Sequence, residues 1–222
     1  TLTATNTTTP SVTDATNLIT LDKTGVADAA GNAGRGTTNS NNYAIDTARP
    51  TASIVVADTA LTVGETSLVT FTFSEAVAGF TTADLTADNG AISALSSSDG
   101  GITWTGTFTP TANVSDASNV ITLDNTGVVD AAGNAGSGTT ESNNYSVTTM
   151  VPVVNSVSTI SANGTYNIGD TIAVAVNFSE AVFLSTGTVQ LTLETGTTDR
   201  ALSYLAGSGS ATIYFSYTVQ TG

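Results

Sequence analysis

Short runs in which apolar and polar residues alternate recur along the chain. The clearest covers residues 67–73. Its first apolar residues are Leu68 and Val69, and Phe71 and Phe73 lie on one face. A period of two residues sends successive side chains to opposite faces of a strand. The pattern therefore predicts β-strands, and no stretch shows the 3.6-residue period of an amphipathic helix.

Residues 102–108 show the same period with an aromatic face. Ile102, Trp104 and Phe108 point one way, and threonines point the other way. Pro110 is expected to end this strand, because proline has no backbone N–H to donate to a neighbour. The expected core of the surrounding segment is Trp104, Phe71, Phe73, Ile121 and either Val69 or Leu68.

Turn signals divide residues 49–150 into seven expected strands. Glycine turns are expected at residues 63–65 and 99–101, and Asn89-Gly90 predicts a type I′ hairpin between the third and fourth strands. Seven short strands in about 100 residues are typical of an immunoglobulin-like β-sandwich, with a seven-stranded barrel as the alternative. The expected strands are residues 52–56, 67–73, 84–87, 91–95, 102–108, 119–123 and 145–149.

The sequence also repeats itself with a period of 102 residues. Asp-Ala-Ala-Gly-Asn-Ala-Gly occupies residues 28–34 and again residues 130–136, and the flanking segments match in the same register. Phe-Ser-Glu-Ala-Val occupies residues 73–77 and returns 105 residues later at residues 178–182. The chain is therefore a tandem array of one structural unit with a diverged third copy.

We expect an all-β chain of tandem immunoglobulin-like sandwiches whose outer two units are incomplete. Residues 1–48 would be the C-terminal part of a repeat, residues 49–150 a complete repeat, and residues 151–222 the N-terminal part of a divergent repeat. The fifth strand is expected in both outer copies, at residues 2–5 and residues 213–216. We interpret the sequence as a window on a longer polypeptide.

The composition narrows the classes of partner and of chemistry. Four Lys and Arg against 18 Asp and Glu give a net charge of −14, which argues against nucleic acids and anionic membranes as partners. The chain has neither Cys nor His, which excludes disulfides, thiolate or imidazole metal sites and Ser-His-Asp triads. Divalent cations are the natural counter-charge, and no apolar run is long enough to insert into a membrane.

Several of these motifs together resemble the bacterial Ig-like repeats of giant adhesins exported by type I secretion (the RTX type). The motifs are the linker at residues 46–51, Phe-Ser-Glu-Ala-Val at 73–77, Asp-Gly-Gly-Ile-Thr-Trp-Thr at 99–105 and Asp-Ala-Ala-Gly-Asn at 130–134. The resemblance covers the first two copies, and the third looks like a divergent relative. It implies an extracellular stalk on the cell surface, often stiffened by calcium, whose repeats serve as spacers and not as catalysts.

The position of the acidic residues along the strands suggests a metal site. If the strands alternate in direction, the ends of the second, fourth and sixth strands lie at the pole where the preceding unit joins. The expected ligand set there is Asp46, Glu75, Asp124, Asp130 and Asn134. Carboxylate and amide oxygens suit Ca²⁺, so calcium is the expected cofactor.

Turn formation is the competing interpretation of the same residues. Asp and Asn side chains accept hydrogen bonds from the backbone two residues on, without any metal. This interpretation is preferred for Asp88 and Asp99, whereas Glu75, Asp130 and Asn134 stay open between the two. Thr148 stands where Asp46 would recur, so a site at the second junction is expected to be weaker or absent.

The sequence favours a structural spacer segment of a very long secreted cell-surface protein, an adhesin stalk or extracellular fibre. Its partners would be neighbouring repeats of the same chain or further copies in a fibre, together with a host or matrix ligand that the sequence does not identify. The first alternative is a subunit of a filament assembled head-to-tail by strand exchange. It is disfavoured because the expected fifth strand would be duplicated at each joint. A glycan- or protein-binding module is a further alternative.

Two other functions find partial support in the same sequence. Rows of threonine at residues 3–7 and 103–107 suggest ice binding, but the neighbouring strands do not continue the array. A glycosidase with two carboxylates is conceivable in an acidic chain. The short loops contain no insertion that would form a pocket, so we expect no enzymatic activity.

Overall fold

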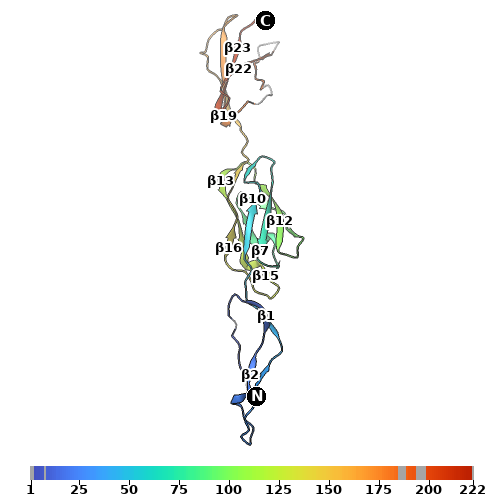
Figure 1. The fold of residues 1–222 in the computed structure, drawn as a ribbon. Helices are drawn as coiled ribbons and strands as arrows, with labels where there is room; N and C mark the ends of the chain where they lie inside the picture. Colours follow the sequence, from blue (N-terminus) through green and yellow to red (C-terminus); the bar gives the residue numbers. More distant parts are fainter. Residues whose placement is uncertain (1–2, 8, 185–188, 194–198, 222) are drawn as a thin grey trace. The chain divides into compact units, whose positions relative to one another are not determined.

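The structure is a computed structural model that describes residues 3–7, 9–184, 189–193 and 199–221. The chain divides into two compact units, Thr1–Thr149 and Met150–Gly222 (Figure 1). Both units are built from β-strands, and the described part contains only three short 3₁₀ helices. No helix in those ranges is long and apolar enough to cross a membrane.

The first repeat contributes two separate strand pairs. In the described residues before Asp46, β1 pairs with β4 and β2 pairs with β3, all antiparallel. The bounds are β1 Thr13–Asn17, β2 Thr20–Asp22, η1 Lys23–Gly25, β3 Thr37–Asn39 and β4 Tyr43–Asp46.

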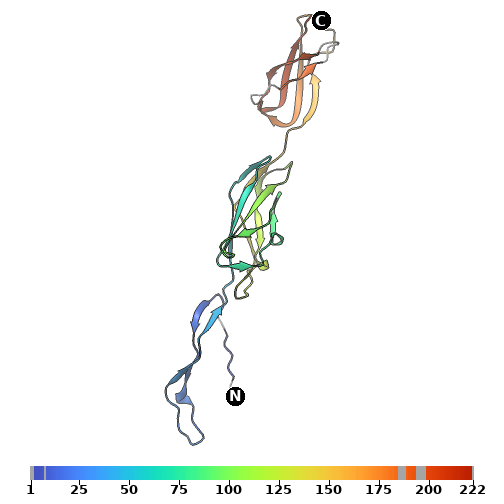
Figure 2. The ribbon, with the colours of Figure 1, turned by 90° about the vertical axis from the view of Figure 1, so that its right-hand side faces the viewer.

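The second repeat forms a two-layer sandwich (Figures 1 and 2). One layer has the strand order β10-β12-β7-β5, with β11 also paired to β12, and the other is made of the sets β13-β17-β6, β16-β14-β9 and β15-β8. The bounds are β5 Ala52–Val56, β6 Ala60–Thr62, β7 Ser67–Phe73, β8 Val77–Ala78, η2 Thr82–Asp84, β9 Leu85–Ala87, β10 Gly90–Ile92, β11 Ser96–Ser97, β12 Thr103–Pro110, β13 Ser115–Asn119, β14 Ile121–Asp124, η3 Asn125–Gly127, β15 Val129–Asp130, β16 Thr139–Glu141 and β17 Tyr145–Thr148. The expected immunoglobulin-like sandwich is confirmed.

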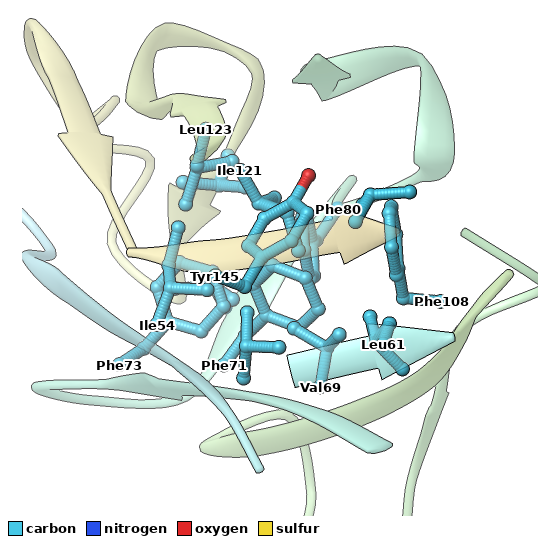
Figure 3. Close-up of a cluster of buried hydrophobic side chains, with 14 residues drawn as sticks. Ile54, Leu61, Val69, Phe71, Phe73, Phe80, Phe108, Ile121, Leu123 and Tyr145 are labelled. Atoms are coloured by element: carbon cyan, nitrogen blue, oxygen red, sulfur yellow. The ribbon is translucent and has the colours of Figure 1, made fainter. Parts of the chain in front are cut away.

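The core of this sandwich is formed by the inward rows of facing strands. In β7, Val69, Phe71 and Phe73 are buried, whereas Leu68 is 54% exposed. Figure 3 shows the side chains of Val69, Phe71 and Phe73 pointing toward those of the opposite layer. The buried cluster is Ile54, Val56, Leu61, Val69, Phe71, Phe73, Val77, Phe80, Phe108, Ile121, Leu123, Val128, Tyr145 and Val147. The alternation in the sequence therefore identified the buried face correctly.

Trp104 lies at the margin of this core and not at its centre. Its side chain is half-buried, and its ring meets Phe80 edge-on with the ring centroids 5.6 Å apart. The indole N–H donates to the carbonyl oxygen of Gly101 at 3.0 Å. This bond satisfies the indole donor, and Phe108 fills the interior beside Tyr145.

The predicted Asn89-Gly90 hairpin is wrong. Asn89 has a φ of +50°, but Gly90 is outside the left-handed region that a type I′ turn requires at both central residues. The flanking strands do not pair with each other, since β9 joins β14 and β10 joins β12. Glycine is needed here for another reason: a Cβ on Gly90 would lie 2.2 Å from the ring of Phe108. The turn carries the chain from one layer to the other.

Two further expectations about strands are corrected. The predicted sixth strand, residues 119–123, is divided between β13 and β14, because the backbone at Val120 pairs with Asp88 while β13 pairs with β17. Residues 3–7 form no strand, although they align with part of β12. In the second repeat β12 is held between β7 and β10, and the described part of the first repeat contains no such neighbours. Residue 2 of the predicted fifth strand lies outside the described residues.

The second unit carries a four-stranded sheet with the order β18-β19-β23-β22. Its strand order corresponds to that of β5-β7-β12-β10, as the alignment of the third copy implies. The strand β19 runs on through residues 178–182, where the second repeat already turns away from β7. The bounds are β18 Val154–Thr159, β19 Thr171–Val182, β20 Thr192–Leu193, β21 Arg200–Ala201, β22 Ser203–Ala206 and β23 Ser210–Thr218.

The core assignment can be tested with a pair of alanine substitutions. Phe108→Ala removes a fully buried ring and should lower the free energy of unfolding by roughly 3 to 5 kcal/mol. Leu68→Ala, on the exposed face of β7, should cost less than about 1 kcal/mol. Denaturant unfolding followed by fluorescence of Trp104, the single tryptophan of the chain, measures both values. Equal losses for the two variants would contradict the assigned inward row.

Candidate metal centre at the junction of two repeats

Three of the five predicted ligands meet where the first repeat joins the second. Asp46 ends β4, Glu75 lies in the turn between β7 and β8, and Asp130 ends β15. One carboxylate oxygen from each residue lies within 4.8 Å of the other two. Asp130 is 4% exposed, and the other two are half-buried. We refer to Asp46, Glu75 and Asp130 as the junction carboxylates.

Asp130 is held in place by its own loop. One of its carboxylate oxygens accepts the backbone N–H groups of Ala132 and Asn134, both at 2.8 Å, and the other accepts the Asn134 side-chain amide at 2.8 Å. Gly133 supplies the positive φ that the tight loop needs. These hydrogen bonds, that from the Asn134 side chain above all, lower the pKa of Asp130, so it is ionised at neutral pH.

The first repeat shows that this loop is encoded locally. Asp28 accepts the corresponding hydrogen bonds from Ala30 and Asn32 at 2.8 to 2.9 Å, and its pKa is lowered in the same way. The sequence Asp-Ala-Ala-Gly-Asn therefore builds the same Asx turn in both copies. The turn interpretation and the ligand interpretation are compatible, because the turn orients a carboxylate that still has free lone pairs.

The linker is tied to the same loop by two further contacts. The Asn134 side chain donates to the backbone carbonyl of Asp46 at 3.2 Å, so it bridges the linker and Asp130. The Arg49 guanidinium donates to the carbonyl of Ala135 at 2.6 Å. The sequence suggested Asn134 as a ligand, but this bridging role and the contact of Arg49 depend on tertiary structure that no local pattern reports.

Glu75 is the junction carboxylate with the least favourable surroundings. Its pKa is raised, first by burial and then by the negative charges of Asp130 and Asp46. Three like charges within this distance repel one another unless a proton or a cation compensates them. The arrangement therefore favours uptake of positive charge.

The donor set fits a hard divalent cation. Carboxylate oxygens are the ligands that Ca²⁺ and Mg²⁺ prefer, and this group offers no nitrogen or sulfur donor. Ca²⁺ tolerates irregular geometry and takes six to eight oxygens, so the three carboxylates would provide part of its shell. When bound, the cation would supply charge neutralisation and a cross-link between the repeats.

Asp124, the fifth predicted ligand, does not join the junction carboxylates. It is exposed and caps the 3₁₀ helix η3, where it accepts the backbone N–H and the hydroxyl of Thr126 at 2.9 and 2.7 Å. Asp99 is likewise a turn former, as expected. It accepts hydrogen bonds from the N–H groups of Thr103 and Ile102, and the bonds from Thr103 above all lower its pKa to about 2.

The second linker differs in the residues that correspond to this site. Thr148 aligns with Asp46, and Val151 aligns with Arg49. Glu180, which aligns with Glu75, lies within β19 and has one buried carboxylate oxygen without a hydrogen-bond partner. The division of the chain into compact units falls at this linker, after Thr149.

Comparisons with known proteins place the chain. It matches the family described as bacterial Ig-like domain over residues 1–45 and again over residues 46–147. No curated protein matches it. One similar solved structure is described as FdeC, a broadly conserved Escherichia coli adhesin that elicits protection against urinary tract infections.

The likeness to that adhesin is distant. The two chains are 12% identical with a TM-score of 0.39, over 77% of this chain and 56% of the other, so this chain spans about half of the adhesin structure. The assignment therefore rests on the two family matches, which cover well over half of the sequence. By those matches and by its sandwich fold, the chain belongs to the bacterial Ig-like domain family.

Proposed function

We propose that this chain is a structural spacer segment of a very long secreted cell-surface protein, with Ca²⁺ bound by the junction carboxylates between its first two repeats. The observation that carries the proposal is the origin of those carboxylates. Asp46 belongs to the first repeat, whereas Glu75 and Asp130 belong to the second. A cation at this position would join two successive units of one chain.

The linker itself supports a spacer role. Only five residues separate the end of β4 from the start of β5, and Pro50 among them is buried. Thr51 is held to Ser74 by hydrogen bonds of 2.9 and 3.0 Å, in addition to the contacts of Arg49 and Asn134. A short linker with fixed backbone has little conformational freedom left. Stiffness of this kind suits a spacer, which keeps its two ends apart and transmits force along the chain.

Charge gives a reason for calcium to regulate this stiffness. With a net charge of −14, the chain attracts divalent cations to clustered carboxylates. Without a cation the junction carboxylates repel one another, whereas a bound cation would attract all three. The junction would therefore be tighter outside the cell, where calcium is abundant, and looser when calcium is removed.

The wider biological role follows from the sequence resemblance to adhesin stalks. In that role the repeats act mechanically and do not catalyse, and the ligand-binding part lies elsewhere in the protein. The partners of this segment are then the neighbouring repeats of its own chain.

Calcium binding should appear as thermal stabilisation that depends on the junction carboxylates. A cation that binds only the folded state at a hundred times its Kd adds about 2.7 kcal/mol of stability. Calorimetry of the 222-residue chain should show a higher Tm in calcium than in a chelator, and Asp46→Asn should abolish most of this difference. Asp124→Asn is the matched control and should keep the calcium response. An equal Tm with calcium and with chelator would refute the site.

Glu75→Gln should have opposite effects with and without calcium. In a chelator at pH 7 the substitution removes a charge that burial, and then repulsion by Asp130 and Asp46, make unfavourable, so it should increase the Tm. With calcium the same variant loses a ligand and should respond less than the unmodified chain.

The chelator effect of Glu75→Gln has a defined pH dependence. A carboxyl whose folded-state pKa is raised destabilises the fold only when ionised, so the advantage of Gln should be full above the raised pKa, shrink as the pH falls toward the ordinary value of 4.5 and be absent below it. Asp130→Asn should show the opposite sign, because the lowered pKa of Asp130 means that its ionised form stabilises the fold. Melting curves from pH 3 to pH 7 measure both. A Tm difference for Glu75→Gln that does not change with pH would exclude repulsion as its cause.

A further inference from the structure

The chain contains two Asn-Gly pairs, and the structure places them in opposite surroundings. Asn89-Gly90 lies at the crossover between the two layers of the second repeat, and Asn163-Gly164 lies in the loop between β18 and β19. In such a pair the backbone nitrogen of the glycine can attack the side-chain amide carbon of the asparagine, because glycine has no Cβ to hinder the approach. The rate depends on how freely these two groups meet.

The side chain of Asn89 is held by its amide nitrogen. This nitrogen donates to a carboxylate oxygen of Asp116 at 3.1 Å and to the side-chain oxygen of Asn119 at 2.6 Å, so both of its hydrogens are used. Rotation of the side chain toward the next backbone nitrogen would break both bonds. Conversion of the amide to a carboxylate would also place a second negative charge beside Asp116, which like-charge repulsion disfavours. The fold therefore opposes a reaction at Asn89.

The backbone around Gly90 is fixed as well. Gly90 pairs with Pro110 where β10 meets β12, and a Cβ at this position would lie 2.2 Å from the ring of Phe108. The carbonyl oxygen of Asn89 accepts the backbone N–H of Thr111 at 2.8 Å. A ring that joined Asn89 to Gly90 would disturb these contacts. Packing therefore accounts for the glycine at residue 90, and the same packing restrains the pair.

Asn163 lies in an exposed segment between two fixed points of its loop. On one side the backbone N–H of Ala173 donates to the hydroxyl of Ser161 at 2.9 Å, and on the other side the hydroxyl of Tyr166 donates to the carbonyl of Ala162. Asn163 itself is exposed, and its side chain makes no hydrogen bond to another residue in the described ranges. Its amide is therefore free to rotate toward the backbone that follows it.

The fold does not require a glycine at residue 164. A Cβ on Gly164 would meet nothing within 4 Å, and the φ of Gly164 lies outside the left-handed region. Its backbone N–H has no hydrogen-bond acceptor among the residues that the structure describes. This glycine therefore leaves an exposed and unhindered nitrogen next to the free amide of Asn163, in contrast to the packed glycine at residue 90.

We propose that Asn163 is a site of spontaneous deamidation, with water as the only co-reactant, and that the fold protects Asn89 from the same reaction. The backbone nitrogen of Gly164 gives its proton to solvent and bonds to Cγ of Asn163, while the bond from Cγ to Nδ2 breaks and ammonia leaves. The resulting five-membered succinimide takes up water at either carbonyl and opens to aspartate or isoaspartate. Both products add a negative charge to the loop, and isoaspartate also lengthens its backbone by one carbon.

Peptide mapping by mass spectrometry measures both sites in one sample. The folded 222-residue chain is kept in mildly alkaline buffer and digested at intervals, and the replacement of NH₂ by OH is followed at each asparagine. Asn89 should react at least about tenfold more slowly than Asn163, because its reaction needs a local opening that breaks its hydrogen bonds. In the denatured chain this protection is lost, so the two sites should react at nearly equal rates.

Gly164→Ala identifies the attacking atom. The variant should keep the Tm and the rate at Asn89, since the added Cβ meets no neighbour, but its Cβ hinders the nitrogen, so Asn163 should react at least about tenfold more slowly. An unchanged rate at Asn163 would exclude attack by this nitrogen.

Two results from the unmodified chain would also overturn the proposal. Equal rates at Asn163 and Asn89 in the folded chain would show that the hydrogen bonds of Asn89 give no protection. A denatured chain in which Asn89 stays slow would assign the difference to the neighbouring sequence and not to the fold.

Discussion

The structure of the second repeat depends on the contact between two apolar layers. Neither layer can bury its apolar face without the other. In the second repeat the row Val69, Phe71 and Phe73 meets Ile121 and Leu123, and all five side chains are almost inaccessible to water. Burial of apolar area is the main favourable term in folding. The separate small sheets of the second layer, some only two strands wide, are stabilised by this contact, since a two-stranded pair is marginal in water by itself.

The same layer contact also fixes the loops that carry the junction chemistry. Val77 and Val128, each two residues along the chain from one of the carboxylates Glu75 and Asp130, are buried, and β8 pairs with β15 through Val77 and Asp130. Glu75 and Asp130 are therefore brought together by the closure of the sandwich, and Asp46 is added by the linker. An acidic group of this kind opposes folding unless it is compensated. A cation bound there, as proposed above, would therefore favour closure of the core.

Much of the fold could be predicted from the sequence, because alternation reports directly on burial. The strands at residues 52–56 and 67–73, and the inward positions of Phe71 and Phe73 in the second, followed from period and residue type alone. The Asn89-Gly90 turn was predicted wrongly, because a hairpin and a crossover between layers use the same local residues. What distinguishes the crossover is tertiary: β9 pairs with β14 and β10 pairs with β12, and glycine at residue 90 leaves room for the ring of Phe108.

The position of the candidate site could be predicted from the alternating direction of the strands. Counting strands placed Asp46, Glu75 and Asp130 at one pole, and the structure brings these three together. Asp124 does not join this group, because its carboxylate caps the 3₁₀ helix η3 by accepting from Thr126. The bridging hydrogen bond of Asn134 to the linker could not be predicted, since it depends on where the carbonyl of Asp46 points.

The near-identity of residues 17–22 and 119–124 has a consequence for how the protein folds as it is synthesised. The first copy of this segment leaves the ribosome before the sheet that β14 will cover exists. When that sheet forms, the earlier segment is already present, tethered and equally apolar. Tandem domains with such interchangeable segments are prone to misassembly between neighbours. The linker of five residues between β4 and β5 works against this error, because it restricts how far the earlier segment can move back onto the sheet.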